Sequence, residues 1–208
     1  MECRSLGRTG AKVSMLCFGC MNFGHRTDDA TAAKMVDQAL DAGINFFDTA
    51  DMYAGGRSEE ALGKAFAANG KRERVLIATK VHGEMDRNDP NKGGIHRRHI
   101  IEGCEASLRR LRTDYIDLYQ LHRTDPQVPV DESLRALDDL VRAGKVRYLG
   151  VSTFPTWRTM EMLWAAREFG LNRVVCEQPP YNLLDRRIER ELVPMARSYG
   201  LGIIAWSP

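Results

Sequence analysis

The sequence predicts an α/β fold, a (β/α)8 or TIM barrel of which about seven βα units are present. Two observations predict this fold. Short apolar segments alternate with helical segments, with a repeat of about 30 residues, which is the length of a βα unit. In addition, polar or ionisable residues close several consecutive apolar segments, namely Asp48, Lys80, His122, Ser152 and Gln178. Barrel enzymes build their active sites from the C-terminal ends of their strands, and this arrangement is typical of them.

Seven segments are expected to form buried parallel strands, because each is a short apolar run rich in β-branched or aromatic residues. They are Met15–Gly19, Ile44–Asp48, Val75–Lys80, Tyr115–His122, Tyr148–Ser152, Val174–Gln178 and Gly202–Trp206. Helices are expected between them, because apolar residues recur there at helical spacing on one face. This spacing is seen at Met35, Val36, Ala39 and Leu40, at Ile100, Ile101, Cys104, Leu108 and Leu111, and at Leu134, Leu137, Leu140 and Val141. Helices commonly end at a left-handed residue, and glycines follow four of the helical segments, at Gly43, Gly144, Gly170 and Gly200.

A doubly wound sheet shows the same alternation of strands and helices and is the alternative fold. A dinucleotide-binding sheet of that kind normally carries the motif G-x-G-x-x-G after its first strand. The corresponding stretch here reads GCMNFG, from Gly19 to Gly24, and does not fit the motif. The barrel is therefore favoured.

The size and charge of the chain favour one domain that acts on small molecules. Its 208 residues, 43% of them hydrophobic, suffice for one substantial core, so residues 1–208 are expected to form a single barrel domain. The 30 basic and 28 acidic residues leave a formal charge of +2, which gives no general attraction to nucleic acid or anionic membranes. The start of the chain has no apolar signal region and no run of about 18 apolar residues follows, which predicts a cytoplasmic protein. The oligomeric state is not predicted.

The five cysteines are an odd and scattered set, which is poor material for a disulfide framework. Cys17 and Cys20 form a CxxC pair, but the pair lies in a strand-like segment rather than at the start of a helix, unlike redox-active pairs. His96 and His99 have no thiol or carboxylate partner at metal-ligand spacing, so no metal site is expected. We interpret the CxxC cysteines as small core residues.

Three ionisable residues are expected to converge at one end of the barrel. Side chains two residues apart share a face of a strand. The residue pairs that share faces are Phe46 and Asp48, Ala78 and Lys80, and Gln120 and His122. If the first member of each pair faces the barrel interior, the three ionisable groups meet at the same mouth.

A tyrosine is expected to join them from the loop after the second strand. Tyr53 lies in this loop, and Gly55 and Gly56 allow the chain to turn sharply behind it. Ser58 is expected to cap the following helix.

Together these side chains describe a site that protonates a developing alkoxide. Tyrosine has a reference pKa of about 10 and is a poor acid at neutral pH, but a nearby ammonium stabilises its phenolate. Lys80 can supply that charge to Tyr53, and Asp48 can keep the lysine protonated and aimed. His122 can place a second hydrogen-bond donor on the same substrate oxygen.

Stretches along the whole chain resemble the aldo-keto reductase superfamily, in the branch of bacterial general reductases and potassium-channel β subunits. These stretches are SLGRTGAKVSMLCFGCMNFG, GINFFDTADMYAGGRSEEALGKAF, VLIATKV, DYIDLYQLHR, GKVRYLGVSTF and EQPPYNLLDRRIERELVPMARSYGLGIIAWSP. The resemblance implies reduction of aldehyde or ketone carbonyls with a nicotinamide cofactor, usually NADPH, which this family binds without a Rossmann motif. It also implies that Tyr53 is the proton donor, that Asp48 and Lys80 tune it, and that His122 completes the catalytic tetrad.

The resemblance further implies which residues contact the cofactor. The matching positions are Gly19, Met21, Asp48, Ser152, Thr153, Gln178, Trp206 and Ser207. Ser152 and Gln178 match residues that hold the nicotinamide carboxamide, and Trp206 matches the aromatic residue stacked on its ring. Gly19 and Met21 lie where the first loop borders the cofactor, and Ser207 begins the loop on the pyrophosphate side.

The chain departs from the family pattern in two ways. The family commonly has asparagine after the serine of GVSNF, where this chain has Thr153, whose hydroxyl is shorter and cannot copy an amide. A barrel of this type also needs about 250 residues, so we expect the barrel to be incomplete at its C-terminus, as a fragment or a truncation. Two alternative functions stay open. The resemblance to channel β subunits implies a cofactor-binding regulatory subunit with little turnover, and the missing C-terminal part of the barrel would give an inactive truncated fragment.

Overall fold

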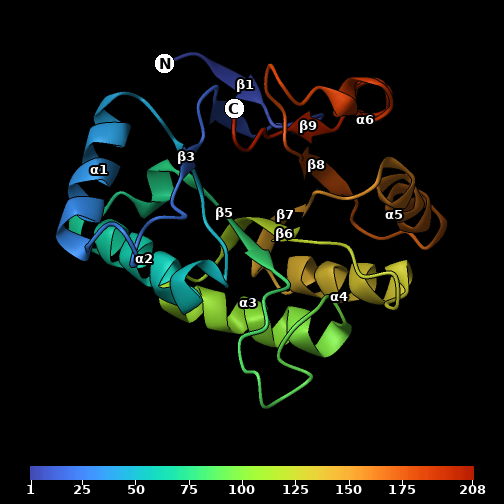
Figure 1. Cartoon of the computed structure of the whole chain (residues 1–208), viewed down its shortest axis with the longest axis horizontal. Helices are drawn as coiled ribbons and strands as arrows, with labels where there is room; N and C mark the ends of the chain where they lie inside the picture. Colours follow the sequence, from blue (N-terminus) through green and yellow to red (C-terminus); the bar gives the residue numbers. More distant parts are fainter.

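The structure is a computed structural model that describes residues 1–208, and its centre is a curled parallel sheet (Figure 1). The strands are β3 (Phe18–Gly19), β4 (Phe46–Asp48), β5 (Leu76–Val81), β6 (Ile116–Leu121), β7 (Val146–Ser152), β8 (Val174–Gln178) and β9 (Gly202–Ile203). They lie side by side in chain order, and every neighbouring pair is parallel. The two edge strands, β3 and β9, do not pair with each other, so the sheet is a partial (β/α)8 barrel. The predicted fold class is confirmed, and each strand overlaps one predicted segment.

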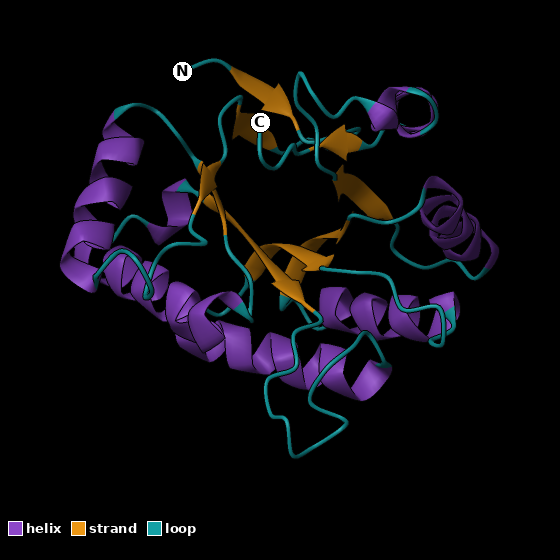
Figure 2. Ribbon diagram, in the orientation of Figure 1, coloured by secondary structure: helices purple, strands orange, loops and turns teal.

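Helices alternate with the strands and cover the convex side of the sheet (Figure 2). They are α1 (Asp29–Asp41), α2 (Arg57–Asn69), α3 (Arg97–Leu111), α4 (Val130–Arg142), α5 (Thr156–Glu168) and α6 (Leu192–Tyr199), with short 3-10 helices η1 (Tyr53–Gly56), η2 (Arg72–Arg74) and η3 (Arg187–Glu189). The four glycines predicted to follow helices all have left-handed φ angles, between 63° and 83°. The longest helix, α3, has 15 residues, and no helix is long and apolar enough to cross a bilayer.

An antiparallel hairpin of β1 (Cys3–Ser5) and β2 (Lys12–Ser14) precedes the barrel and is not predicted from the sequence. Its turn packs under the N-terminal ends of β8 and β9, where Arg8 donates a backbone hydrogen bond of 2.9 Å to the carbonyl of Gly200. Gly7 has a φ of 56°, and a Cβ atom there would lie 2.6 Å from the carbonyl oxygen of Val175. Only glycine fits this close approach.

Apolar side chains fill both sides of the sheet. A cluster of 39 buried residues lies between the strands and the helices, as in other α/β folds. A second cluster of eight buried residues fills the concave side: Leu6, Val13, Phe46, Ala78, Leu118, Val175, Cys176 and Ile204. Phe46 and Ala78 therefore face the barrel interior, which is the condition on which the predicted convergence of Asp48 and Lys80 depended. The side chains two residues further along these strands face the C-terminal mouth.

Candidate active site

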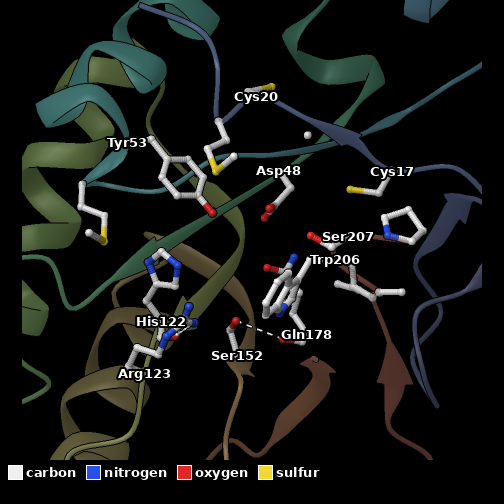
Figure 3. A pocket seen from close by; sticks show the side chains of 16 residues that line it. Cys17, Cys20, Asp48, Tyr53, His122, Arg123, Ser152, Gln178, Trp206 and Ser207 are labelled. Carbon is white, nitrogen blue, oxygen red and sulfur yellow. Dashed lines mark hydrogen bonds between the residues drawn. The ribbon is translucent and has the colours of Figure 1, made fainter. Parts of the chain in front are cut away.

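A cleft of about 450 Å³ opens at the C-terminal ends of the strands. It is lined by Cys17, Gly19, Cys20, Met21, Asp48, Met52, Tyr53, His122, Arg123, Ser152, Gln178, Ile204, Ala205, Trp206, Ser207 and Pro208. Figure 3 shows the hydroxyl of Tyr53, the carboxylate of Asp48 and the ring of His122 directed toward the same space. Two residues expected at the site do not line the cleft: Lys80 is fully buried beneath it, and Thr153 lies beside it.

Lys80 is the structural centre of the site, because all three hydrogens of its ammonium group have partners. Its Nζ donates to Asp48 Oδ1 at 2.6 Å, to the Thr49 carbonyl oxygen at 2.8 Å and to Tyr53 Oη at 3.3 Å. Lys80 side-chain exposure is 0% and that of Asp48 is 12%, so the ion pair is shielded from solvent. Because Lys80 donates to the phenolic oxygen, the hydroxyl hydrogen of Tyr53 has no acceptor within the protein and remains available to the cleft.

The charge of Lys80 is set by two opposing effects. Burial by itself lowers the pKa of Lys80, because a low-dielectric environment disfavours the ammonium form. Attraction to the carboxylate of Asp48 raises the pKa, with a further contribution from Tyr53, and the result lies above the ordinary value for lysine. Lys80 is therefore protonated at neutral pH.

The loop that carries Tyr53 owes its shape to three consecutive left-handed residues. Ala54, Gly55 and Gly56 have φ angles of 52°, 66° and 92°, and they turn the chain from η1 into α2. The predicted cap by Ser58 is wrong: Gly56 is the N-cap residue, and Ser58 is buried in the first turn of α2. The Ser58 hydroxyl instead donates to the Cys20 carbonyl oxygen at 2.7 Å, because its side chain faces the core.

His122 lies directly after β6, with its ring edge-on to that of Tyr53 at a centroid distance of 5.6 Å. Burial is the largest cause that lowers the pKa of His122 to about 3, and the positive charges of Lys80 and Arg123 lower it further. The imidazole is therefore neutral at pH 7 and has one N–H donor. Its Nδ1 is buried and makes no hydrogen bond in the protein.

Ser152, Gln178 and Trp206 form the opposite wall of the cleft. The hydroxyl of Ser152 donates to the backbone carbonyl of Gln178 at 3.0 Å, which leaves its lone pairs free to accept. The side-chain amide of Gln178 lines the cleft and makes no hydrogen bond within the protein. A Cβ atom at Gly19 would meet no atom within 4 Å, so the backbone there borders open space. These groups fit a flat ligand that carries an amide.

Thr153 supports the wall from outside the cleft. Its hydroxyl oxygen accepts hydrogen bonds from Arg123 Nη1 at 3.2 Å and from Trp206 Nε1 at 3.3 Å. Its φ angle is 56°, which is unusual for a β-branched residue. Thr153 therefore holds Trp206 and Arg123 at the expense of backbone strain.

The sequence did not indicate several residues that line the cleft. Arg123 is one of them, and its position directly after His122 is the one feature of the sequence that could have identified it. Cys17 and Cys20 line the wall near β3, where burial raises the pKa of both thiols. All five cysteines are free, and no group of three or more His, Cys, Asp or Glu side chains is placed to hold a metal ion.

Known proteins resemble the chain over its whole length. The aldo/keto reductase family matches residues 15–208. The uncharacterized oxidoreductase YrpG of Bacillus subtilis is 45% identical over 218 residues, which cover 100% of this chain and 66% of that protein. A probable voltage-gated potassium channel subunit beta of Oryza sativa is 38% identical over 211 residues, with 100% and 64% covered. Versiconal hemiacetal acetate reductase of Aspergillus parasiticus is 37% identical over 231 residues, with 100% and 67% covered. The chain thus spans about two thirds of the length of these relatives.

Proposed function

The chain belongs to the aldo/keto reductase family, and on this premise we propose that the protein is an oxidoreductase that reduces aldehyde or ketone carbonyls to alcohols with NADPH. One observation supports this proposal above the others. A buried, protonated Lys80 contacts both the carboxylate of Asp48 and the phenolic oxygen of Tyr53. A buried lysine that only stabilised the fold would not need a tyrosine at the floor of an open cleft.

Tyr53 is the proton donor in this proposal. Its hydroxyl hydrogen is free to point into the cleft, where it can reach the oxygen of a bound carbonyl. As that oxygen gains negative charge, Tyr53 transfers its proton to it and becomes a phenolate. The ammonium of Lys80 stabilises this phenolate, and Asp48 keeps the ammonium charged and in position.

His122 orients the substrate. The imidazole is neutral, so its one N–H group donates a hydrogen bond without competing with Tyr53 as an acid. With Nδ1 buried and without a partner, the tautomer protonated at Nε2 directs this donor to the cleft. The carbonyl oxygen then receives two hydrogen bonds, from Tyr53 and His122, which fix its position.

The opposite wall of the cleft would hold the nicotinamide end of NADPH. Ser152 and Gln178 offer an acceptor and an amide to the carboxamide of the cofactor, and Trp206 offers an aromatic face to its ring. Gly19, Met21 and Ser207 border the same space. When bound, the cofactor supplies the hydride that is added to the carbonyl carbon.

Replacement of Tyr53 by phenylalanine tests the assignment of the proton donor. We expect Tyr53→Phe to lower kcat for 4-nitrobenzaldehyde roughly 100- to 10,000-fold, the usual range for removal of a general acid. NADPH binding, measured by calorimetry, should stay within about threefold, because the removed hydroxyl is not part of the carboxamide wall. Tyr199→Phe is the matched control, because Tyr199 lies on α6 outside the cleft.

The same assay separates the proposal from a regulatory subunit with little turnover. Oxidation of NADPH by the parent protein, lost in Tyr53→Phe and kept in Tyr199→Phe, supports a reductase. Equal rates in parent and Tyr53→Phe would show that another group donates the proton. Tight NADPH binding with no oxidation of any aldehyde would favour the regulatory alternative.

A further inference from the structure

The proposed function leaves one charged group of the cleft without a role. Only two ionised side chains line the cleft, Asp48 and Arg123. The charge of Asp48 is balanced by Lys80 at 2.6 Å. The charge of Arg123 has no such balance, since no carboxylate lies within ion-pair distance of its guanidinium group.

The guanidinium group is nevertheless held in place. Its Nη1 donates to the backbone carbonyl of His122 at 2.7 Å and to the hydroxyl of Thr153 at 3.2 Å. Its Nε and Nη2 groups have no hydrogen-bond partner in the protein. Figure 3 shows Arg123 beside His122, at the edge of the space toward which Tyr53 points. An arginine fixed through one nitrogen presents its remaining donors in a planar array that suits a carboxylate.

The nearby acid Glu177 does not neutralise Arg123. Glu177 is fully buried in β8, where its Oε1 accepts a hydrogen bond from the backbone N–H of Phe154 at 3.1 Å. Burial raises the pKa of Glu177 to about 8, so this carboxyl group is mostly uncharged at pH 7. An unpaired, positioned cation at the rim of a partly apolar cleft attracts anionic ligands.

We propose that Arg123 is a specificity-determining residue that binds a carboxylate on the substrate, so that the preferred substrates are carbonyl compounds bearing a negatively charged carboxylate. This inference rests on the proposed reductase function and adds the substrate class to it. Arg123 and His122 are adjacent, so one substrate can place its carbonyl oxygen at His122 and its carboxylate at the guanidinium group. The phosphates of NADPH are the other source of a similar anion, and the experiment distinguishes the two.

The test compares two aldehydes of similar shape, 4-carboxybenzaldehyde, which is anionic, and 4-nitrobenzaldehyde, which is neutral. The measured quantity is the ratio of their kcat/KM values, which cancels changes in folding, cofactor binding and the pKa of His122. We expect Arg123→Gln to lower this ratio roughly 10- to 100-fold, the value of a charge-assisted hydrogen bond. Arg123→Lys should lower the ratio less than Arg123→Gln does, since the charge remains but the planar pair of donors is lost.

Two further variants sharpen the comparison. Arg123→Glu should lower the ratio more than Arg123→Gln does, because repulsion replaces attraction. Arg109→Gln is the matched control: Arg109 is exposed on α3 and forms no ion pair, and its loss should leave the ratio unchanged. If Arg123 had only a structural role, its replacement would lower kcat/KM for both aldehydes by the same factor, and the ratio would not change.

The outcomes separate the possible errors. A ratio that changes less than about threefold in Arg123→Gln overturns the inference but not the reductase function. Weaker NADPH binding with an unchanged ratio assigns Arg123 to the cofactor phosphates and also overturns it. If the parent reduces neither aldehyde, the reductase function fails. Whether Arg123 binds a carboxylate is then decided by calorimetric titration with 4-(hydroxymethyl)benzoate, which is anionic, and 4-nitrobenzyl alcohol, which is neutral. Loss of binding of the anionic alcohol alone in Arg123→Gln then supports the carboxylate site, and equal effects on both alcohols overturn it.

Discussion

Lys80→Met should destabilise the fold as well as stop turnover, because it leaves the carboxylate of Asp48 without its partner. Methionine has a similar length and fills the same buried space, so the main loss is electrostatic. Asp48 loses an ion pair of 2.6 Å, and the carbonyl oxygen of Thr49 loses a donor at 2.8 Å. What remains at Asp48 Oδ2 is a weak contact of 3.5 Å from the side-chain amide of Gln120.

Removal of one partner from a buried ion pair costs about 3–5 kcal/mol of the free energy of unfolding. The value at this site should lie near the lower end, about 3 kcal/mol, because water from the cleft reaches Asp48 and screens its charge. The Asp48 side chain is 12% exposed, whereas Lys80 is fully buried. Asp48→Asn in the Lys80→Met background should restore about 2 kcal/mol, because the charge that lacked a partner is then gone.

Urea unfolding at pH 7, followed by far-ultraviolet circular dichroism, gives the free energies for the parent, the two single variants and the double variant. Lys64→Met is the control, because Lys64 pairs with Asp29 at 2.7 Å on the surface, with side-chain exposures of 44% and 53%. The free energy of unfolding of Lys64→Met should equal that of the parent within error, because an exposed ion pair contributes little to stability. The reasoning is refuted if Lys80→Met loses less than about 1 kcal/mol, or if the effects of the two site substitutions simply add.

Two smaller predictions concern Thr153 and Glu177. Thr153→Asn should raise Tm by about 2–4 °C, because asparagine adopts the left-handed φ of 56° more readily and its amide oxygen can still accept a hydrogen bond from Trp206. Thr153→Ser is the control. A lower Tm for the asparagine variant than for the parent would contradict the proposed backbone strain at Thr153. Burial raises the folded-state pKa of Glu177 to about 8, so its stabilising contribution is complete below the unfolded pKa of about 4.3 and is lost as the pH rises through about 8. Glu177→Gln should therefore flatten the decline of Tm between pH 5 and pH 8, and parallel profiles for parent and variant would show that Glu177 does not cause it.

The five inner parallel strands, β4 to β8, could be predicted from the sequence because most of their residues are buried, whereas the residues of the edge strands β3 and β9 are half-buried or exposed. β5 and β8 begin with the apolar runs LIA and VVC, and a short apolar run is the usual mark of a buried strand. The β1–β2 hairpin could not be predicted from its sequence pattern. Its strands have three residues each and β1 is entirely exposed, so neither length nor alternation distinguishes it from a loop.

Residues of the site that lie within strands could be predicted, whereas Arg123 and the conformation of Thr153 could not. Asp48 and Lys80 lie within strands, where the two-residue period fixes the face of each side chain. Arg123 lies beyond the end of β6, where no periodicity applies and an arginine is most often solvated. The left-handed conformation of Thr153 could not be predicted either, because a β-branched side chain argues against it and only the surrounding contacts impose it.

Lys80 and His122, the two basic side chains that contact Tyr53, show how burial and neighbouring charges together decide protonation. Burial by itself favours the neutral form of both side chains, and it is the largest cause of the lowered pKa of His122. Lys80 faces the carboxylate of Asp48 and stays protonated, while His122 faces the cations of Lys80 and Arg123 and stays neutral. A site with both groups charged would repel itself, and a site with both neutral could not stabilise a phenolate. One fixed cation below the tyrosine and one neutral donor beside it is the combination that lets Tyr53 give up a proton while the substrate oxygen is held in place.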